Sequence, residues 1–266
     1  MATNAFRYGV LELTGRDSFS FLQAQLATDL RAVVADAAHA AQPACLLNPQ
    51  GRVLAFGMLL KRDAESWQWL LEAELVPDIL LRLGKFVLRS KVSLRAREDL
   101  GVALALEPAQ CTDPAGRGIH VDAALVGAEL SIESRLHAIR YGLIDFAKEH
   151  QDLYLADALQ LALWRAVSLT KGCFPGQEVV ARMHYLGRGK RHLRLFAAER
   201  QPNLMSELSD AAGASVGRWL CALPDGNGWL GLAVIEDRAV GQLQCVAIDV
   251  TAVTVTEIQL LSQGNS

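Results

Sequence analysis

The sequence lacks several patterns that would assign it to a specialised class. Its five cysteines are an odd number without a C-x-x-C pair, which argues against a disulfide framework and a thiolate metal site. No basic segment followed by an apolar one stands at the start, so we expect no signal peptide. The longest apolar stretch, residues 53–60, is too short to span a bilayer. These absences favour a reduced, cytoplasmic protein without a membrane partner.

The chain also has little net charge, at −3 for 266 residues. Hydrophobic residues make up 51% and charged residues 21%, as in ordinary folded proteins. The length suits one large domain or two to three smaller ones. Because the net charge is small, the composition does not indicate a dedicated nucleic-acid binder, and we expect any anion site to be local.

Predicted strands alternate with predicted helices through the first half of the chain. The first helix has a cap at Asp17 or Ser18 and carries apolar side chains through Leu26 to Leu30. Pro77 suits the first turn of the second helix. We expect strands at 8–14, 44–47, 52–61, 67–72, 92–97 and 102–106, and a third helix at 131–140. This order indicates an α+β fold.

The pattern changes near residue 190, where we place a domain boundary between 1–190 and 191–266. Short strand-like runs follow one another without helices between them, and Pro224-Asp225-Gly226-Asn227 is a hairpin turn. The segment 201–213 is loop-like. The expected strands are 193–197, 215–220, 229–235, 244–250 and 253–260. Such a series predicts a small antiparallel barrel.

One stretch, Lys171 to Arg194, combines a cysteine, a turn and a helix start. Cys173 follows Lys171 by two residues, and Pro175-Gly176 leads into a predicted helix at 177–186. A nearby cation and the N-terminus of a helix both favour the thiolate form of cysteine. The alternative is a small buried cysteine, which is the commoner role of a free thiol and the one that spacing alone favours.

Further residues of this stretch fit either role. Gly172 and Gly176 permit backbone angles that a side chain would block. Glu178 suits the first turn of the helix and can pair with Arg182 one turn later. No acidic residue stands between positions 179 and 198, so the cations there form either a local anion site or a solvated linker. Those cations are Arg182, Arg188, Lys190, Arg191 and Arg194.

The run KGCFPGQEVVAR, followed by Gly187, Lys190 and Arg191, resembles a family signature, K-G-C-[FY]-x-G-Q-E. That signature marks the YgfZ branch of the folate-binding YgfZ/GcvT family, which is related to the glycine-cleavage T-protein, an aminomethyltransferase. LTGRDSFSFLQAQLATDL, LNPQGR and KFVLRSKV are similar to the family's N-terminal half in order and spacing. The resemblance implies a GcvT-like folate-binding fold of two ferredoxin-like units followed by a small C-terminal antiparallel β-barrel.

The resemblance also implies a function. Members of this branch support assembly or repair of iron–sulfur clusters in client enzymes, including tRNA-modifying ones, and are linked to tetrahydrofolate. It implies Cys173 and Lys171 as the reactive residues, and contact between folate and Tyr8, Lys190 and Arg191. The remaining motif residues are Gly172, Gly176, Gln177, Glu178 and Arg182. Tyr8 could equally be a strand residue packed on a neighbour. We expect folate and iron–sulfur client enzymes as partners, and no direct binding of tRNA.

Two departures from the family pattern bear on the alternative function, a tetrahydrofolate-dependent aminomethyl or other one-carbon transferase. The T-protein has an aspartate where this chain has Ala55 and Phe56, which cannot accept a proton. Relatives have a glutamate where this chain has Arg140, and the loss of that carboxylate weakens recognition of a pterin. Both changes favour an accessory protein over an enzyme. A third hypothesis is a scaffold that docks a client through the basic segment.

Overall fold

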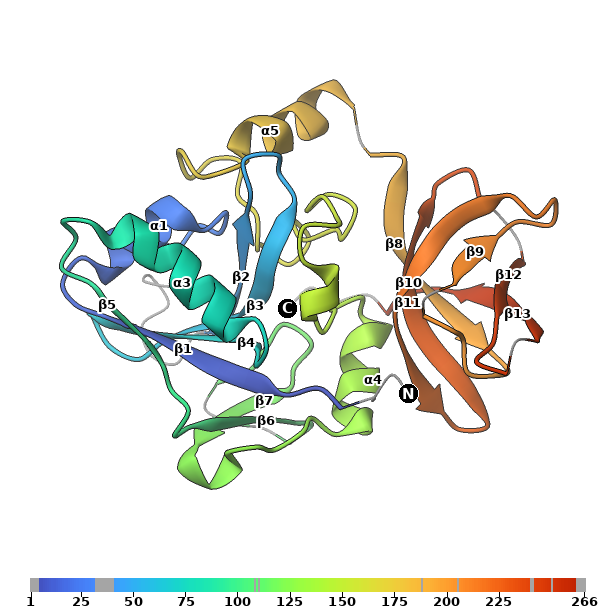
Figure 1. The fold of residues 1–266 in the computed structure, drawn as a ribbon, viewed down its shortest axis with the longest axis horizontal. Helices are drawn as coiled ribbons and strands as arrows, with labels where there is room; N and C mark the ends of the chain where they lie inside the picture. The colour runs from blue at the N-terminus through green and yellow to red at the C-terminus, as the bar shows by residue number, and fades with distance from the viewer. Residues whose placement is uncertain are drawn as a thin grey trace. The chain divides into compact units, whose positions relative to one another are not determined.

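The computed structural model describes residues 5–31, 41–107, 109, 111–187, 189–204, 206–239, 242–249 and 251–261. They form two compact units, coloured along the chain in Figure 1. Unit 1 comprises the described residues up to Ser131 together with Asp145–Ala156 and Leu161–Gly187. Unit 2 comprises Ile132–Ile144, Asp157–Gln160 and the described residues that follow Arg188.

Unit 1 is built on a five-stranded antiparallel sheet with the order β2-β3-β4-β1-β5. Its helices are α1 (Ser18–Gln25), α3 (Val76–Val87) and α5 (Gln177–Leu186). The strands are β1 (Tyr8–Thr14), β2 (Ala41–Leu47), β3 (Val53–Lys61), β4 (Ser66–Glu72) and β5 (Ser93–Ala96).

Successive side chains of β1 point to opposite faces of this sheet, and the two faces have different neighbours. A Cβ atom on Gly9 would lie 2.9 Å from the Val76 side chain, so this face of β1 meets α3. The alternate residues, Tyr8 and Val10, share an apolar cluster with Val102 and other residues of a second, two-stranded sheet. That sheet consists of β6 (Gly101–Ala105) and β7 (Gly118–Asp122). Short 3₁₀ turns follow at Ala123–Leu125 and Lys148–His150.

Unit 2 combines one helix, α4 (Ile132–Arg140), with a closed barrel in the order β10-β11-β8-β13-β12-β9. Phe196 and Trp219 meet edge to face in the barrel core, with ring centroids 6.1 Å apart. The hairpin turn predicted at Pro224–Asn227 joins β10 to β11. The strands are β8 (Arg191–Ala198), β9 (Glu207–Ser209), β10 (Ser215–Asp225), β11 (Gly228–Glu236), β12 (Leu243–Val246) and β13 (Ala252–Ile258).

The α+β fold with a small antiparallel barrel is confirmed, and three local predictions need correction. The first helix ends at Gln25, because Leu26 is already extended, and does not continue to Leu30. The segment 201–213, predicted as a loop, contains β9. The strand expected at 244–250 ends at Val246, and Val250 lies outside the described residues. No helix in the described part of the chain is long and apolar enough to cross a membrane.

Candidate functional site

The loop that precedes α5 alternates between buried and exposed side chains. Lys171 and Phe174 are buried in unit 1, whereas Gly172 and Cys173 between them are exposed. The other four cysteines are buried, and burial raises the pKa of the Cys45 and Cys111 thiols. The alternative role of Cys173, a small buried residue, is therefore wrong. This loop presents the exposed thiol of the chain.

Gly176 gives the loop its direction into α5. Its backbone is left-handed, with φ 82° and ψ 0°, and it is the N-cap residue of the helix. A Cβ atom at this position would lie 2.5 Å from the carbonyl oxygen of Asn48 and 3.0 Å from Cα of Gly51. Both neighbours are backbone atoms of the β2–β3 turn. Only glycine therefore fits between the loop and that turn.

Asn48 stiffens the turn on which the loop rests. Its Oδ1 accepts a hydrogen bond from the Arg52 backbone N–H at 2.9 Å, and its Nδ2 donates to Asp152 at 2.5 Å. The Gly51 N–H closes the turn by donating to the Asn48 carbonyl oxygen at 3.0 Å. The segments LNPQGR and KGCFPGQE, which lie more than a hundred residues apart in the sequence, thus form one packed structure.

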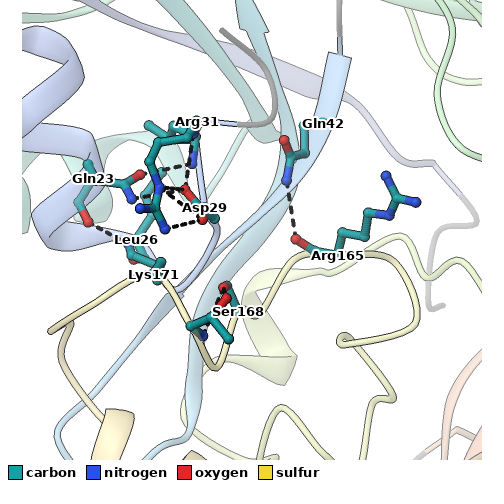
Figure 2. A network of polar contacts seen from close by, with 10 residues as sticks. Gln23, Leu26, Asp29, Arg31, Gln42, Arg165, Ser168 and Lys171 are labelled. Atoms are coloured by element: carbon teal, nitrogen blue, oxygen red, sulfur yellow. Dashed lines mark hydrogen bonds and ion pairs between the residues drawn. The ribbon is translucent and has the colours of Figure 1, made fainter. Parts of the chain in front are cut away.

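Lys171 anchors the other end of the loop, as Figure 2 shows. Its Nζ donates to the carbonyl oxygen of Gln23 at 2.5 Å and to that of Leu26, the residue that caps α1. The carbonyl end of a helix attracts a cation, and the ammonium also lies 5.2 Å from the centre of the Phe174 ring. Burial lowers the pKa of Lys171 to about 8, against an opposing effect of Asp29.

A second polar cluster holds the end of α1 in place (Figure 2). Asp29 accepts hydrogen bonds from Arg31, and these lower the pKa of its carboxyl group. Gln23 donates its amide to Asp29 at 3.0 Å and accepts from the Leu30 N–H at 2.8 Å. The carbonyl groups that receive Lys171 are therefore held by contacts within their own segment.

The predicted motif residues on α5 are mostly exposed. Gln177 is half-buried, whereas Glu178 and Arg182 are exposed. The predicted ion pair between Glu178 and Arg182 is absent from the ion pairs of the described residues. None of the ten helix residues is fully buried.

The basic stretch after α5 differs from the prediction. Arg191 pairs with Glu236 at 2.8 Å, and Arg194 pairs with Glu257 at 3.2 Å, both within unit 2. Acidic residues distant in sequence thus offset these cations, because the closed barrel brings β8 beside β11 and β13. Lys190 is exposed, and Arg188 lies outside the described residues.

Four positions that bear on pterin binding, Tyr8, Ala55, Phe56 and Arg140, can each be described within their own unit. Tyr8 is buried in unit 1, where its ring meets Phe6 edge to face with centroids 5.2 Å apart, as the packing alternative predicted. Ala55 and Phe56 are buried in β3 and carry no carboxylate. In unit 2, Arg140 holds both carboxylate oxygens of Asp225 at 2.8 Å. These positions therefore fit tetrahydrofolate poorly.

The chain has the fold of the aminomethyltransferase T proteins. The structure of glycine cleavage system aminomethyltransferase T from Bartonella henselae matches it with a TM-score of 0.71. The match covers 96% of this chain and 84% of that one, and the sequence identity of 13% supports the fold alone. No protein-family model matches the chain.

The sequence relatives of the chain include proteins named YgfZ and IBA57. An uncharacterized protein of Haemophilus influenzae is 29% identical over 206 residues, 73% of this chain and 72% of that protein. An iron–sulfur cluster assembly factor IBA57 homolog, mitochondrial, from Mycosarcoma maydis is 29% identical over 67% of this chain and 52% of its own length. The tRNA-modifying protein YgfZ from Edwardsiella ictaluri is 27% identical over 77% of this chain and 74% of its own length. The chain is thus a homologue of the YgfZ proteins, as the loop motif predicted, and also of the IBA57 proteins.

Proposed function

We propose that the chain is an accessory protein for the assembly or repair of iron–sulfur clusters, in which Cys173 is the reactive thiol. One observation carries the proposal: Cys173 is exposed on an anchored loop, whereas the other four cysteines are buried. The names of its relatives, an iron–sulfur cluster assembly factor and a tRNA-modifying protein, agree with this role. Its clients on this proposal are iron–sulfur enzymes, including enzymes that modify tRNA.

Cys173 can supply one thiolate to iron. The thiol loses its proton as the S–Fe bond forms, since the thiolate is the metal ligand. In the described part of the chain, no group of three or more His, Cys, Asp or Glu residues could hold a metal ion. A cluster usually has four thiolate ligands, so a client or carrier protein must provide the others. The cluster is therefore cargo in this proposal.

Lys171 acts in this proposal as a positioning residue. Its ammonium is bound to the end of α1, where it fixes the backbone beside Cys173. Gly176 does the same from the opposite side, against the β2–β3 turn. The loop thus holds the thiol at the surface without burying it.

The test is complementation of a deletion strain with the variant Cys173→Ala. The expected result is loss of activity of a client such as a tRNA methylthiolase, measured from the modified nucleoside in its tRNA. Thr170→Ala is a matched control, because Thr170 is exposed and stands three residues before the cysteine. Full complementation by Cys173→Ala would remove the thiol from the proposal.

Tetrahydrofolate as a cofactor stays a prediction, as does the division into a folate-binding region 1–190 and a barrel domain 191–266. Lys190 and Arg191 are the exposed residues of the predicted folate set, and Arg191 is paired with Glu236. A calorimetric titration of the full chain with tetrahydrofolate tests the cofactor. Saturable binding that is weakened in Lys190→Ala would support tetrahydrofolate as the cofactor. Absence of binding at about millimolar ligand, the range of the weakest specific sites, would exclude it.

The transferase alternative has the fold in its favour, since the structural relative is an aminomethyltransferase. Its chemistry needs a group that accepts or stabilises a proton on the folate nitrogen, and Ala55 and Phe56 provide none. Turnover of an aminomethylated carrier protein in the presence of tetrahydrofolate would establish this alternative. We therefore place it second.

A further inference from the structure

A cavity of about 320 Å³ opens in unit 1, where the chain leaves β5 and turns away from β1. The last hydrogen bond between the two segments runs from the Arg97 N–H to the Val10 carbonyl oxygen. Beyond it, the first residues of α3, the start of β6 and the segment 126–128 line the space. Small-molecule sites have volumes of about 300–1,000 Å³, so this cavity suits a ligand of the smallest size.

The lining of the cavity is mainly aliphatic. It includes Val10, Val76, Leu100 and Val126, and Val126 is 54% exposed. An aliphatic group that entered the cavity would cover this apolar surface, which favours binding. Tyr8 is the one aromatic residue of the lining, and its ring already packs edge to face on Phe6. The cavity therefore favours an aliphatic ligand over a flat aromatic one.

Two of the charged residues that line the cavity have opposite signs and are free to bind a ligand. Arg97 is engaged, because its guanidinium pairs with Glu12 at 2.5 Å and with Asp99 at 2.8 Å. Arg7 and Glu98 also line the cavity and are exposed. Neither of them belongs to an ion pair among the residues that the structure describes.

The backbone brings these two residues to the same end of the cavity. Arg7 stands three residues before Val10, and Glu98 stands one residue after Arg97, so both lie beyond the last hydrogen bond of the antiparallel pair. The Arg7 carbonyl oxygen accepts a hydrogen bond from the Ala73 N–H, which extends the ladder between β1 and β4. Arg7 therefore shares the sheet face of Gly9, the face that meets α3.

We propose that this cavity binds a free aliphatic α-amino acid such as leucine. Its carboxylate meets the Arg7 guanidinium, its ammonium group meets the Glu98 carboxylate, and its side chain enters the aliphatic part of the cavity. An α-amino acid carries both charges and the apolar group on one carbon atom, which is the combination that the lining offers. Cys173 does not line the cavity, so the proposal goes beyond the role of that thiol and does not depend on it.

Ligands with a single kind of charge fit this lining less well. A fatty acid would satisfy Arg7 but bring its carboxylate close to Glu98, where like charges repel. An amine would have the same conflict with Arg7. A phosphate ester would bring still more negative charge beside Glu98. The two opposite charges therefore favour a zwitterion.

Isothermal titration calorimetry of the full chain with leucine tests the site. Three further ligands each remove one part of leucine: 4-methylpentanoate lacks the ammonium group, 3-methylbutylamine lacks the carboxylate, and glycine lacks the side chain. We expect saturable binding of leucine. Each of the other three ligands should bind about tenfold more weakly or worse, the effect of losing one charge-assisted or apolar contact.

Two variants assign the charges of the ligand to residues. Arg7→Met and Glu98→Gln should each weaken the binding of leucine about tenfold or more. Arg7→Met should also bind leucine and 3-methylbutylamine about equally, and Glu98→Gln should bind leucine and 4-methylpentanoate about equally. Arg16→Met and Glu199→Gln make the same changes at exposed residues that do not line the cavity, so they should leave binding unchanged. Equal urea midpoints for all four variants would exclude a loss of folding as the cause.

Three results would overturn the proposal. The first is the absence of saturable binding at about millimolar leucine, the range of the weakest specific sites. The second is binding of glycine, 4-methylpentanoate or 3-methylbutylamine that is as tight as that of leucine in the unmodified chain. The third is leucine binding that is the same in Arg7→Met, in Glu98→Gln and in the unmodified chain, because the ligand would then lie elsewhere.

Discussion

The cysteine loop and the outer face of α3 are both exposed parts of unit 1, but they differ in how closely their glycines are packed. Cys173 lies on a loop fixed by buried contacts, from Lys171 to α1 and from Gly176 to the β2–β3 turn. Gly84 of α3 is also exposed, and a Cβ atom built on it would meet no heavy atom within 4 Å beyond its chain neighbours and its own helix backbone. Substitution of the residues that anchor the loop should therefore lower folding stability, whereas an added side chain at Gly84 on the outer face of α3 should not.

The largest effect is expected for Gly176→Ala. The new Cβ atom would clash with the Asn48 carbonyl oxygen at 2.5 Å, and alanine disfavours the left-handed backbone. The strain and the overpacking together should lower the free energy of unfolding by about 3 kcal/mol. Urea denaturation followed by circular dichroism measures it.

Gly172→Ala is the matched control. Gly172 also has a positive φ, 102°, but a Cβ atom there would meet no atom within 4 Å. Its substitution should lower stability by about 1–2 kcal/mol, the cost of the backbone alone. Equal losses for both variants would contradict the packing of the loop on the β2–β3 turn.

The second effect concerns Lys171→Met, which retains a long apolar side chain but cannot donate. The carbonyl groups of Gln23 and Leu26 would lose a charged donor, so we expect a loss of about 2 kcal/mol at pH 7. The same urea series measures it. Lys61→Met, a lysine of β3 that is not buried, should have a much smaller effect. An unchanged stability would show that Lys171 does not anchor the loop.

The pH dependence of this variant gives a third test. The pKa of Lys171 is lowered from 10.5 to about 8, so between these values the folded state binds fewer protons than the unfolded state. The free energy of unfolding then rises with pH in this window, and the contribution is lost as the pH falls through about 8. Lys171→Met lacks this contribution, so its deficit relative to the unmodified chain should widen from pH 7.5 to about 9.5. A constant deficit would contradict the lowered pKa.

A smaller effect of opposite sign is expected at Gly84, on the outer face of α3. Gly84→Ala should raise the free energy of unfolding by about 1 kcal/mol, since alanine is the best helix former and nothing obstructs its Cβ atom. The urea midpoint should shift upward. A destabilised variant would mean that the glycine serves the fold itself, and the contrast between the two regions would fail.

Local patterns in the sequence predicted much of the fold. The helix expected at 177–186 is α5, because its glycine cap and apolar spacing lie within one short segment. Pro77 marked the start of α3 for the same reason. The hairpin at Pro224–Asn227 is likewise set by its own turn residues. Periodicity and turn chemistry act over a few residues, so they can be read without the tertiary structure.

Contacts between distant segments could not be predicted in this way. The end of α1 receives Lys171, which stands 145 residues beyond Leu26. Arg194 pairs with Glu257, which lies 63 residues later in the sequence. The basic stretch after α5, which has no acidic residue of its own, is therefore partly neutralised within the barrel. The resemblance located the cysteine loop, but it could not reveal that Lys171 binds α1. β9 has only three residues, too few for a periodic signal.

The smallest effect on stability is expected for Cys173→Ala. The side chain is exposed, so the free energy of unfolding should change by less than about 0.5 kcal/mol. The reactivity of the chain toward a thiol reagent should change much more. The native chain should have one thiol that reacts rapidly with 5,5′-dithiobis(2-nitrobenzoic acid), because the other four are buried. Cys173→Ala should lose this fast phase, and Cys45→Ala should keep it. A fast phase that persists in Cys173→Ala would mean that another cysteine is accessible, and the loop would lose its distinction as the site of the exposed thiol.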